Sequence, residues 1–322
     1  MKKIIKKMLA PISALLLLSA CSLPGLGSNL TGEGEGISIT GGAATEMSIM
    51  GYIVEGMVEH YIDIDANVIT NLFSTMNHQA TMTGAANVSA IRYTGTSLTG
   101  ELGQEAVTDP ELAKKKVVEG FDEEFDQKWF PSYGFANTYA FLVQEQTAEK
   151  YDLEKVSDLE EYQGEFDVGV DTNWINRDGD GYDDFQRLYG FEFDNLLPMS
   201  LGLMYTAFSN DEIDVALGYS TDGGIVSENL VVLEDDLNLF PPYDASPIAN
   251  YEVLESYPEL ELIFQKLEGE IDESVMQELN YTSDNFLIEP KVVAKQWLEE
   301  MNFFEDTEPY IEPVESSVVS DD

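Results

Sequence analysis

Four tyrosines of this 322-residue chain lie in short turn-like segments rather than on repeating apolar faces. Tyr93 precedes Thr-Gly-Thr, Tyr139 follows Asn-Thr, Tyr219 precedes Ser-Thr-Asp-Gly, and Tyr243 follows Phe-Pro-Pro. Tyrosines at loop and strand ends present their π faces to a cleft. Several such faces together favour a cation that cannot donate hydrogen bonds, such as a quaternary ammonium. Because the chain has 16 tyrosines, any one of them taken alone is more often a core residue.

Residues that could carry out catalysis are sparse. His60 and His78 are the only histidines; His60 ends an amphipathic segment, and His78 stands between Asn77 and Gln79. Neither belongs to a nucleophile motif, and the sequence has no Gly-x-Ser-x-Gly elbow and no phosphate-binding loop. The sequence therefore predicts a protein that is not an enzyme, with no catalytic residue and no cofactor.

Residues 176–181, Asn-Arg-Asp-Gly-Asp-Gly, imitate the start of a calcium-binding EF-hand loop. The twelfth position of such a loop supplies a bidentate glutamate, whereas this chain has Arg187, whose charge would repel the metal. A tight Asp/Gly turn is the favoured interpretation, and no metal site is predicted. Weak incidental calcium binding is the alternative that the motif leaves open.

The first 20 residues have the features of a signal peptide. Four lysines precede an apolar run from Met8 to Leu18, which is shorter than the ~20 residues that a membrane-spanning helix needs. The run leads into Leu-Ser-Ala-Cys, and Cys21 is the only cysteine, so we expect Cys21 to accept lipid rather than to form a disulfide. A chance cysteine beside an ordinary cleavage site is the alternative. Lipidation would anchor the protein at the extracytoplasmic face of the cell membrane.

Two segments are not expected to join the folded part. Residues 21–36 are rich in Gly and Ser and predict a lipidated flexible tether, and residues 305–322 predict an acidic disordered tail.

The formal net charge of −45 disfavours nucleic acid as a partner, because phosphate binding needs clustered Lys and Arg. The acidity favours a solvated acidic coat over long-range attraction of cationic substrates.

Between these ends, short apolar runs alternate with helical periodicity. Strand-like runs occur at residues 37–40, 138–143, 167–170, 214–218 and 230–233, and helical segments at 46–61, 111–129, 156–162, 199–209, 252–267, 273–279 and 290–303. The alternation predicts an α/β architecture, and the length suffices for two lobes. A monomer is expected.

Seven segments resemble the substrate-binding lipoproteins of osmoprotectant ABC transporters, which bind glycine betaine, carnitine or choline. They are RYTGTSLTG (92–100), SYGFANTYAF (132–141), GVDTNW…GDGYDDF (169–185), GYSTDGGI (218–225), LVVLEDD (230–236), FPPYDASP (240–247) and MQELNY (276–281). The resemblance runs in order from Ile37 to Phe304. It implies a two-lobed periplasmic-binding-protein-like fold of type II, a ligand in the interlobe cleft, and an ABC transporter permease as partner.

The resemblance also implies where the lobes and the site lie. The first lobe is expected at residues 37–130 and 238–304 and the second lobe at 131–237, with crossings near 129–137 and 234–241. The implied ligand-binding residues are four cage tyrosines and two polar neighbours: Tyr93, Tyr139, Tyr219, Tyr243, Thr96 and Asn137. Closure of the lobes around the ligand is expected, because contacts from both lobes exist fully only in the closed state.

Two positions bear on which ligand is taken. In the family, the position of Thr96 can instead be Asp, which is associated with restriction toward choline; threonine there implies a broad range that includes betaine and carnitine. Where the family commonly has Gln in the first loop, this chain has only Gly42, Ala43 and Ala44, so a polar contact is missing. The alternatives are a protein of the same fold that binds another small molecule, or a surface lipoprotein without a transport role.

Overall fold

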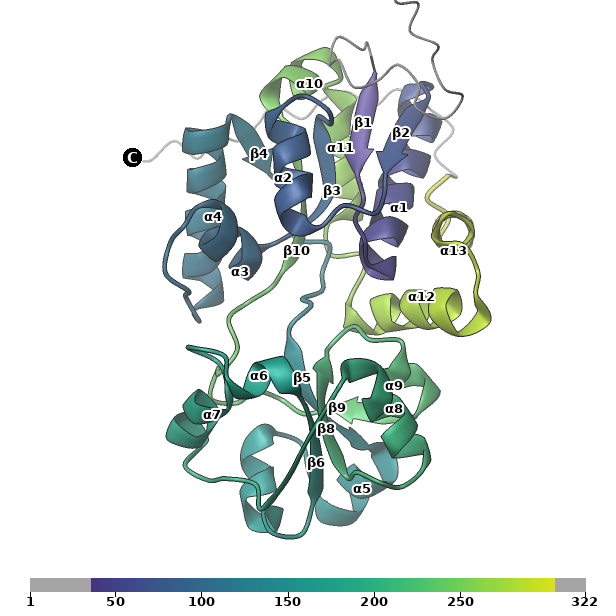
Figure 1. The fold of residues 1–322 in the computed structure, drawn as a ribbon. Coiled ribbons are helices and arrows are strands. Elements are labelled where there is room, and N and C mark those ends of the chain that lie inside the picture. The colour runs from purple at the N-terminus through teal and green to yellow at the C-terminus, as the bar shows by residue number, and fades with distance from the viewer. Residues whose placement is uncertain (1–35, 305–322) are drawn as a thin grey trace, which may run out of the picture.

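The computed structural model of the chain describes residues 36–304, which form two lobes, each built on a five-stranded sheet (Figure 1). The predicted signal peptide, Cys21, the tether up to residue 35 and the tail at 305–322 lie outside the described residues. Helices pack on both sheets, which confirms the predicted α/β class and the two lobes. Within residues 36–304, no helix is both long enough and apolar enough to cross a membrane.

The first lobe begins with the chain up to residue 129. Its sheet has the order β2-β1-β3-β10-β4; β1 is parallel to β2 and β3, and β10 is antiparallel to β3 and β4. The elements of this part are β1 (Ile37–Thr40), α1 (Thr45–Ile62), β2 (Ala66–Ile69), α2 (Ser74–Met82), β3 (Val88–Tyr93), α3 (Thr94–Thr96), the π-helix η1 (Ser97–Glu101), α4 (Pro110–Phe125) and β4 (Gln127–Trp129).

The second lobe follows, on a sheet with the order β7-β6-β8-β5-β9. Its elements are β5 (Tyr139–Gln144), α5 (Glu145–Tyr151), the 3₁₀ helix η2 (Val156–Tyr162), β6 (Asp167–Asp171), α6 (Thr172–Ile175), α7 (Tyr182–Tyr189), β7 (Asn195–Met199), α8 (Leu201–Ser209), β8 (Val215–Tyr219), α9 (Gly224–Ser227) and β9 (Leu230–Val232). The chain then returns to the first lobe as β10 (Ala245–Asn250), α10 (Tyr251–Ser256), α11 (Glu259–Leu267), α12 (Glu273–Phe286) and α13 (Pro290–Glu300).

Helix α1 is the centre of the first core. Ile49, Ile53 and Met57 recur every four residues and are fully buried, because the helix packs on the sheet and against α11, α12 and α13. The second core gathers around the aromatic side chains of Phe141 and Phe185, whose ring centroids are 5.4 Å apart. Each lobe therefore has its own apolar core.

The four strands predicted for the second lobe agree with β5, β6, β8 and β9 to within one residue at each end. The predicted helix at 111–129 is wrong at its end: Asp126 adopts φ 56°, which stops α4, and the next three residues form β4. The predicted helix at 252–267 is broken at Tyr257 and Pro258, and α12 continues to Phe286 instead of ending at 279.

Two chain segments cross between the lobes, residues 130–138 and 233–244, and they lie side by side (Figure 1). Asn137 N donates to Tyr243 O at 3.1 Å, and Ala245 N donates to Phe135 O at 3.0 Å. These backbone bonds join the outgoing crossing to the returning one, so the residues on the two crossings have fixed positions relative to each other.

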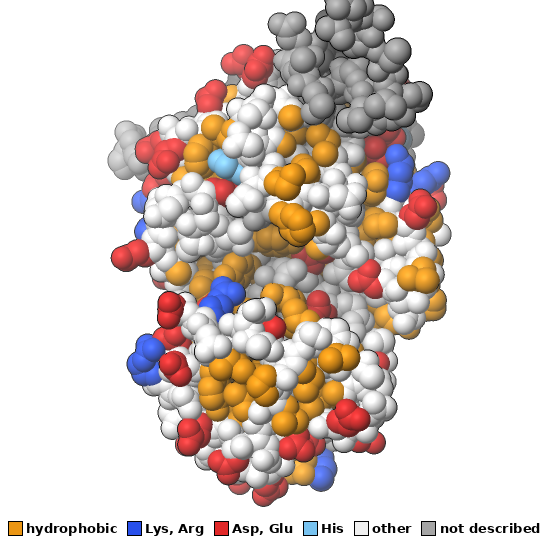
Figure 2. Space-filling model, viewed as in Figure 1, with side chains coloured by type: hydrophobic (Ala, Val, Ile, Leu, Met, Phe, Trp, Pro, Cys, Tyr) orange, Lys and Arg blue, Asp and Glu red, His pale blue; other side chains and the backbone are white. Residues whose placement is uncertain are grey.

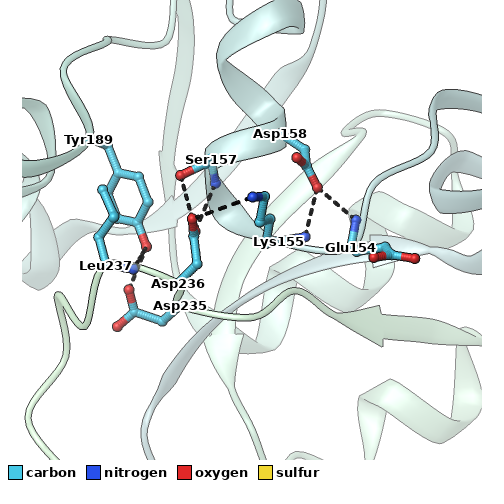
Figure 3. Close-up of polar contacts among 8 residues, drawn as sticks. All are labelled: Glu154, Lys155, Ser157, Asp158, Tyr189, Asp235, Asp236 and Leu237. Carbon is cyan, nitrogen blue, oxygen red and sulfur yellow. Dashed lines mark hydrogen bonds and ion pairs between the residues drawn. The ribbon is translucent and has the colours of Figure 1, made fainter.

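The returning crossing is held onto the second lobe by side-chain carboxylates (Figure 3). Asp236 accepts hydrogen bonds from Ser157 Oγ at 2.7 Å and from Ser157 N at 3.2 Å. Asp235 accepts from the Tyr189 hydroxyl at 2.5 Å, and also from the backbone N–H of Phe240 at 2.9 Å. This anchoring fixes the start of the segment that carries Phe240 and Tyr243.

Candidate ligand-binding site

Tyr139 and Tyr219 stand at the ends of neighbouring strands that point toward the first lobe. They are register partners across β5 and β8, and their rings stack with centroids 4.9 Å apart and planes 18° apart. Phe240, from the returning crossing, lies 5.8 Å from the Tyr139 ring. The antiparallel register thus turns two tyrosines that are far apart in sequence into one aromatic pair.

Tyr243 is linked to this pair by Arg177, which follows α6. Arg177 Nη2 donates to the Tyr243 hydroxyl oxygen at 2.9 Å, and its guanidinium carbon lies 5.3 Å from the centre of the Tyr139 ring. Arg177 Nε lies 2.6 Å from Asp180 Oδ1. One guanidinium therefore contacts two of the predicted cage tyrosines and is held by a buried carboxylate.

The segment of Tyr243 also packs against the turn after Tyr93. A Cβ atom at Gly95 would lie 2.8 Å from Pro242 O and 3.0 Å from Tyr243 Cε1. The Thr94 hydroxyl donates to the same Pro242 oxygen at 2.9 Å. Only glycine allows this close approach, which places Tyr243 next to the end of β3.

Tyr93 and Asn137 meet on one carboxylate, that of Glu46. The Tyr93 hydroxyl donates to Glu46 Oε1, and Asn137 Nδ2 donates to the same oxygen at 3.0 Å. Asn280 Nδ2, from α12, lies 3.4 Å from Glu46 Oε2 and also donates to Thr221 O of the second lobe at 2.8 Å. The carboxylate of Glu46 is therefore a junction between the first lobe, the outgoing crossing and the second lobe.

Burial governs the protonation of this junction. Glu46 is 3% exposed, and burial raises its pKa, while hydrogen bonds from Asn137, Thr221, Tyr93 and Asn280 oppose the rise. Burial together with the adjacent carboxylate raises the pKa of Tyr93 well above its usual value, so the phenol keeps its proton. Glu46 stands in the first turn of α1, where the helix N-terminus favours a negative charge.

Thr96 lies in α3, one helical turn after Tyr93, and is half-buried. The six predicted site residues therefore come from β3 and α3, from both crossings, and from the facing ends of β5 and β8. Figure 2 shows that this face of the molecule is hollowed between the lobes, with hydrophobic, acidic and basic side chains around the hollow.

The model of one family, the substrate binding domain of ABC-type glycine betaine transport systems, matches residues 35–300. The chain belongs to this family. The carnitine transport binding protein OpuCC of Listeria monocytogenes is 47% identical over 306 residues, which is 93% of this chain and 98% of the relative. A glycine-betaine-binding protein of Pseudomonas aeruginosa is 30% identical over 285 residues, covering 85% of this chain and 90% of the relative.

Solved structures agree with this membership. The crystal structure of a glycine betaine/carnitine/choline ABC transporter is 45% identical, with a TM-score of 0.81, and the match covers 83% of this chain and 99% of that one. Apo YehZ from Escherichia coli, 22% identical with a TM-score of 0.76 over 84% of this chain and all of its own, shows the same fold. This chain is thus an extracytoplasmic substrate-binding protein of an ABC importer and not an enzyme.

Two residues of this site, Glu46 and Arg177, make contacts that the sequence does not predict. The sequence puts Glu46 at the start of a predicted helix and gives it no role, although an acidic residue soon after two glycines at a helix start is a visible signal. Arg177 belongs to the segment that imitates an EF-hand loop, and the sequence predicts no ligand contact for it. In the structure it neutralises Asp180, and within residues 36–304 no group of three or more His, Cys, Asp or Glu side chains could hold a metal ion.

A cavity of about 520 Å³ borders the same crossings and shares only Tyr139 with the four predicted cage tyrosines. Tyr139 and Phe240 line it together with Gln277, whereas Tyr93, Tyr219 and Tyr243 do not. Two of its acidic lining residues have partners: Glu273 accepts from Ala136 N at 3.0 Å, and Asp272 caps α12 through Val275 N at 2.8 Å.

Proposed function

We propose that this protein captures quaternary-ammonium osmoprotectants, namely glycine betaine, carnitine and choline, in a cage of Tyr93, Tyr139, Tyr219 and Tyr243, and delivers them to an ABC transporter permease. The observation that carries the proposal is the convergence of these four tyrosines at the boundary of the lobes. Arg177 donates to Tyr243 and lies over the Tyr139 ring, and Glu46 joins Tyr93 to Asn137 of the outgoing crossing. Two relatives are named as a carnitine transport binding protein and a glycine-betaine-binding protein, which supports the same ligand class.

The trimethylammonium group would lie against the phenol faces, because it has no N–H that could donate a hydrogen bond to an acceptor. Each desolvated cation–π contact contributes on the order of 0.5–2 kcal/mol, so the cage supplies a few kcal/mol. Micromolar affinity corresponds to about 8 kcal/mol, and binding also costs translational and ordering entropy. The remainder has to come from the other end of the ligand.

Betaine and carnitine carry a carboxylate, and Arg177 is the cation that contacts the tyrosine cluster in residues 36–304. A charge-assisted hydrogen bond from a guanidinium contributes about 1.5–3 kcal/mol. We therefore assign the ligand carboxylate to Arg177, with Thr96 and Asn137 as neutral donors. This cation would compensate for the polar contact that is missing at Gly42, Ala43 and Ala44.

Closure would bring these groups together around the ligand. Tyr139, Tyr219 and Arg177 belong to the second lobe, Tyr93 belongs to the first, and Tyr243 lies on the returning crossing. A ligand that contacts all of them binds the closed state more tightly than the open one, which is what drives closure. The domain boundaries at residues 37–130, 131–237 and 238–304 and the monomeric state belong to the same proposal.

The lipid anchor is part of the proposal too. Residues 1–20 would be removed as a signal peptide, Cys21 would carry the lipid, residues 21–36 would act as the tether, and 305–322 would be an acidic tail. Anchoring would keep the protein at the outer face of the membrane, near its permease.

A second candidate is another solute bound by the same fold. The ergothioneine transport permease/ergothioneine binding protein EgtU of Helicobacter pylori is 32% identical over 262 residues, covering 80% of this chain and 46% of the relative. A surface lipoprotein without a transport role is the third candidate. A thermal-shift screen of the purified, delipidated protein decides among them: betaine, carnitine and choline should raise the melting temperature, whereas a response to ergothioneine alone, or to no solute, would contradict the proposal.

A further inference from the structure

The buried carboxylates of this protein fall into two groups. Within residues 36–304, four acidic residues are buried: Glu46, Glu55, Asp171 and Asp180. Glu55 pairs with Lys291 at 2.5 Å, and Asp180 pairs with Arg177 at 2.6 Å. In that same part of the chain, neither Glu46 nor Asp171 forms an ion pair with a basic side chain.

The two unpaired carboxylates are the two that touch phenols of the proposed cage. The Tyr93 hydroxyl donates to Glu46 in the first lobe, and the Tyr139 hydroxyl donates to Asp171 Oδ2 at 3.3 Å in the second. We propose that Glu46 and Asp171 form an anionic layer behind the cage that makes it select cations over uncharged molecules of the same shape. This inference rests on the proposed function, because it concerns the same site.

The surroundings of Glu46 suit an ionised carboxylate. Donor groups converge on its two oxygens: the Tyr93 hydroxyl and the side-chain amides of Asn137 and Asn280. An ionised carboxylate accepts several hydrogen bonds at once, whereas a protonated one must also donate. A buried charge without a partner is costly, and a cationic ligand would supply the missing compensation.

The phenols transmit this charge to the ligand. A tyrosine that donates its proton toward a carboxylate has a more electron-rich ring, and the attraction of a ring for a cation is electrostatic. The carboxylates also attract the cation directly across an interior of low dielectric constant, where such interactions are stronger than in water. An uncharged molecule gains from neither effect.

The test compares choline with 3,3-dimethyl-1-butanol, in which a tert-butyl group replaces the trimethylammonium group. Glu46→Gln and Asp171→Asn keep the size and the acceptor oxygen of each side chain but remove its charge. For each variant of the full mature chain we expect choline to bind about tenfold more weakly, with the affinity for the uncharged isostere unchanged. Calorimetry measures the affinity for choline, and displacement of bound choline measures the affinity for the uncharged isostere.

Asp122→Asn is the matched control, because Asp122 accepts a hydrogen bond from Tyr251, an exposed phenol–carboxylate pair outside the cage. This variant should leave both affinities unchanged. Equal losses for choline and the isostere in Glu46→Gln and Asp171→Asn would overturn the inference, since the carboxylates would then only position the rings. Unchanged choline affinity in both variants would also overturn it. If the wild-type protein bound no trimethylammonium compound, the proposed function itself would fail.

Discussion

Arg177 of the second lobe donates a hydrogen bond of 2.9 Å from Nη2 to the hydroxyl oxygen of Tyr243 on the returning crossing. The two residues are joined across the lobe boundary, and the same guanidinium lies over the ring of Tyr139. Arg177 therefore occupies the place where a cage for a cation and a donor for a carboxylate would meet.

Arg177→Ala should weaken the binding of glycine betaine by at least tenfold. The binding of choline should weaken much less, because choline has no carboxylate and so has no charge-assisted hydrogen bond to lose. Calorimetric dissociation constants for the two ligands measure the difference. Arg187→Ala is the control: Arg187 pairs with Asp184 on the surface, and its loss should change neither constant. Equal weakening of both ligands in Arg177→Ala would mean that Arg177 acts on the tyrosines rather than on the carboxylate.

Tyr139→Ala should weaken the binding of betaine, carnitine and choline by at least tenfold, since it removes one ring of the cage and the stacking partner of Tyr219. Tyr139→Phe keeps the ring but removes the hydroxyl that donates to Asp171, so its affinity should fall less than that of Tyr139→Ala. Fluorescence or calorimetric titration of both variants checks this order. Unchanged affinity in the alanine variant would remove Tyr139 from the cage.

Thr96→Asp should shift preference from betaine toward choline, because a carboxylate on α3 would repel the carboxylate of betaine and carnitine. The readout is the ratio of the two dissociation constants, which we expect to change by about tenfold. Thr96→Asn, which has nearly the same shape without the charge, serves as the comparison. A similar loss of both ligands in Thr96→Asp would count against repulsion as the cause.

Choline binding should weaken as the pH falls through the pKa of Glu46. Burial raises that pKa, so protonation starts at a higher pH than for a solvated glutamate, and the neutral acid no longer attracts a cation. Tyr93, the titratable side chain in contact with Glu46, has a raised pKa and stays protonated throughout. Choline is chosen because it does not titrate in this range.

The folding stability that Glu46 contributes changes with pH in the opposite direction to the choline affinity. A raised pKa means that Glu46 holds its proton more tightly in the folded protein than in the unfolded chain. As the pH falls from the folded pKa to the unfolded pKa, the contribution of Glu46 to the free energy of unfolding therefore increases. Glu46→Gln should flatten both dependences. A pH profile of choline affinity that is the same in the wild type and in this variant would exclude Glu46 as the titrating group.

The sequence predicted the strands of the second lobe best, because β5, β6 and β8 are buried apolar runs bounded by polar turns. It did not predict β2, β3, β4, β7 or β10. These strands are short or of mixed composition, and β10 contains a proline. Their pairing depends on partners far away in the chain, as when β10 inserts between β3 and β4.

The candidate site divides in the same way. The cage tyrosines could be named from their turn segments and from a family resemblance, whereas the contacts of Glu46 and Arg177 could not. Glu46 and Asn137 are 91 positions apart, and Arg177 and Tyr243 are 66 positions apart. Such contacts result from the way the two crossings and α12 bring the lobes together, which local sequence patterns do not encode.

A crystal structure of the delipidated protein with choline tests the central claim most directly. The proposal predicts closed lobes, with the choline nitrogen within about 6 Å of the ring centroids of at least three of Tyr93, Tyr139, Tyr219 and Tyr243. Choline bound elsewhere, for example in the cavity beside Gln277, or choline with its nitrogen away from these four rings, would contradict it.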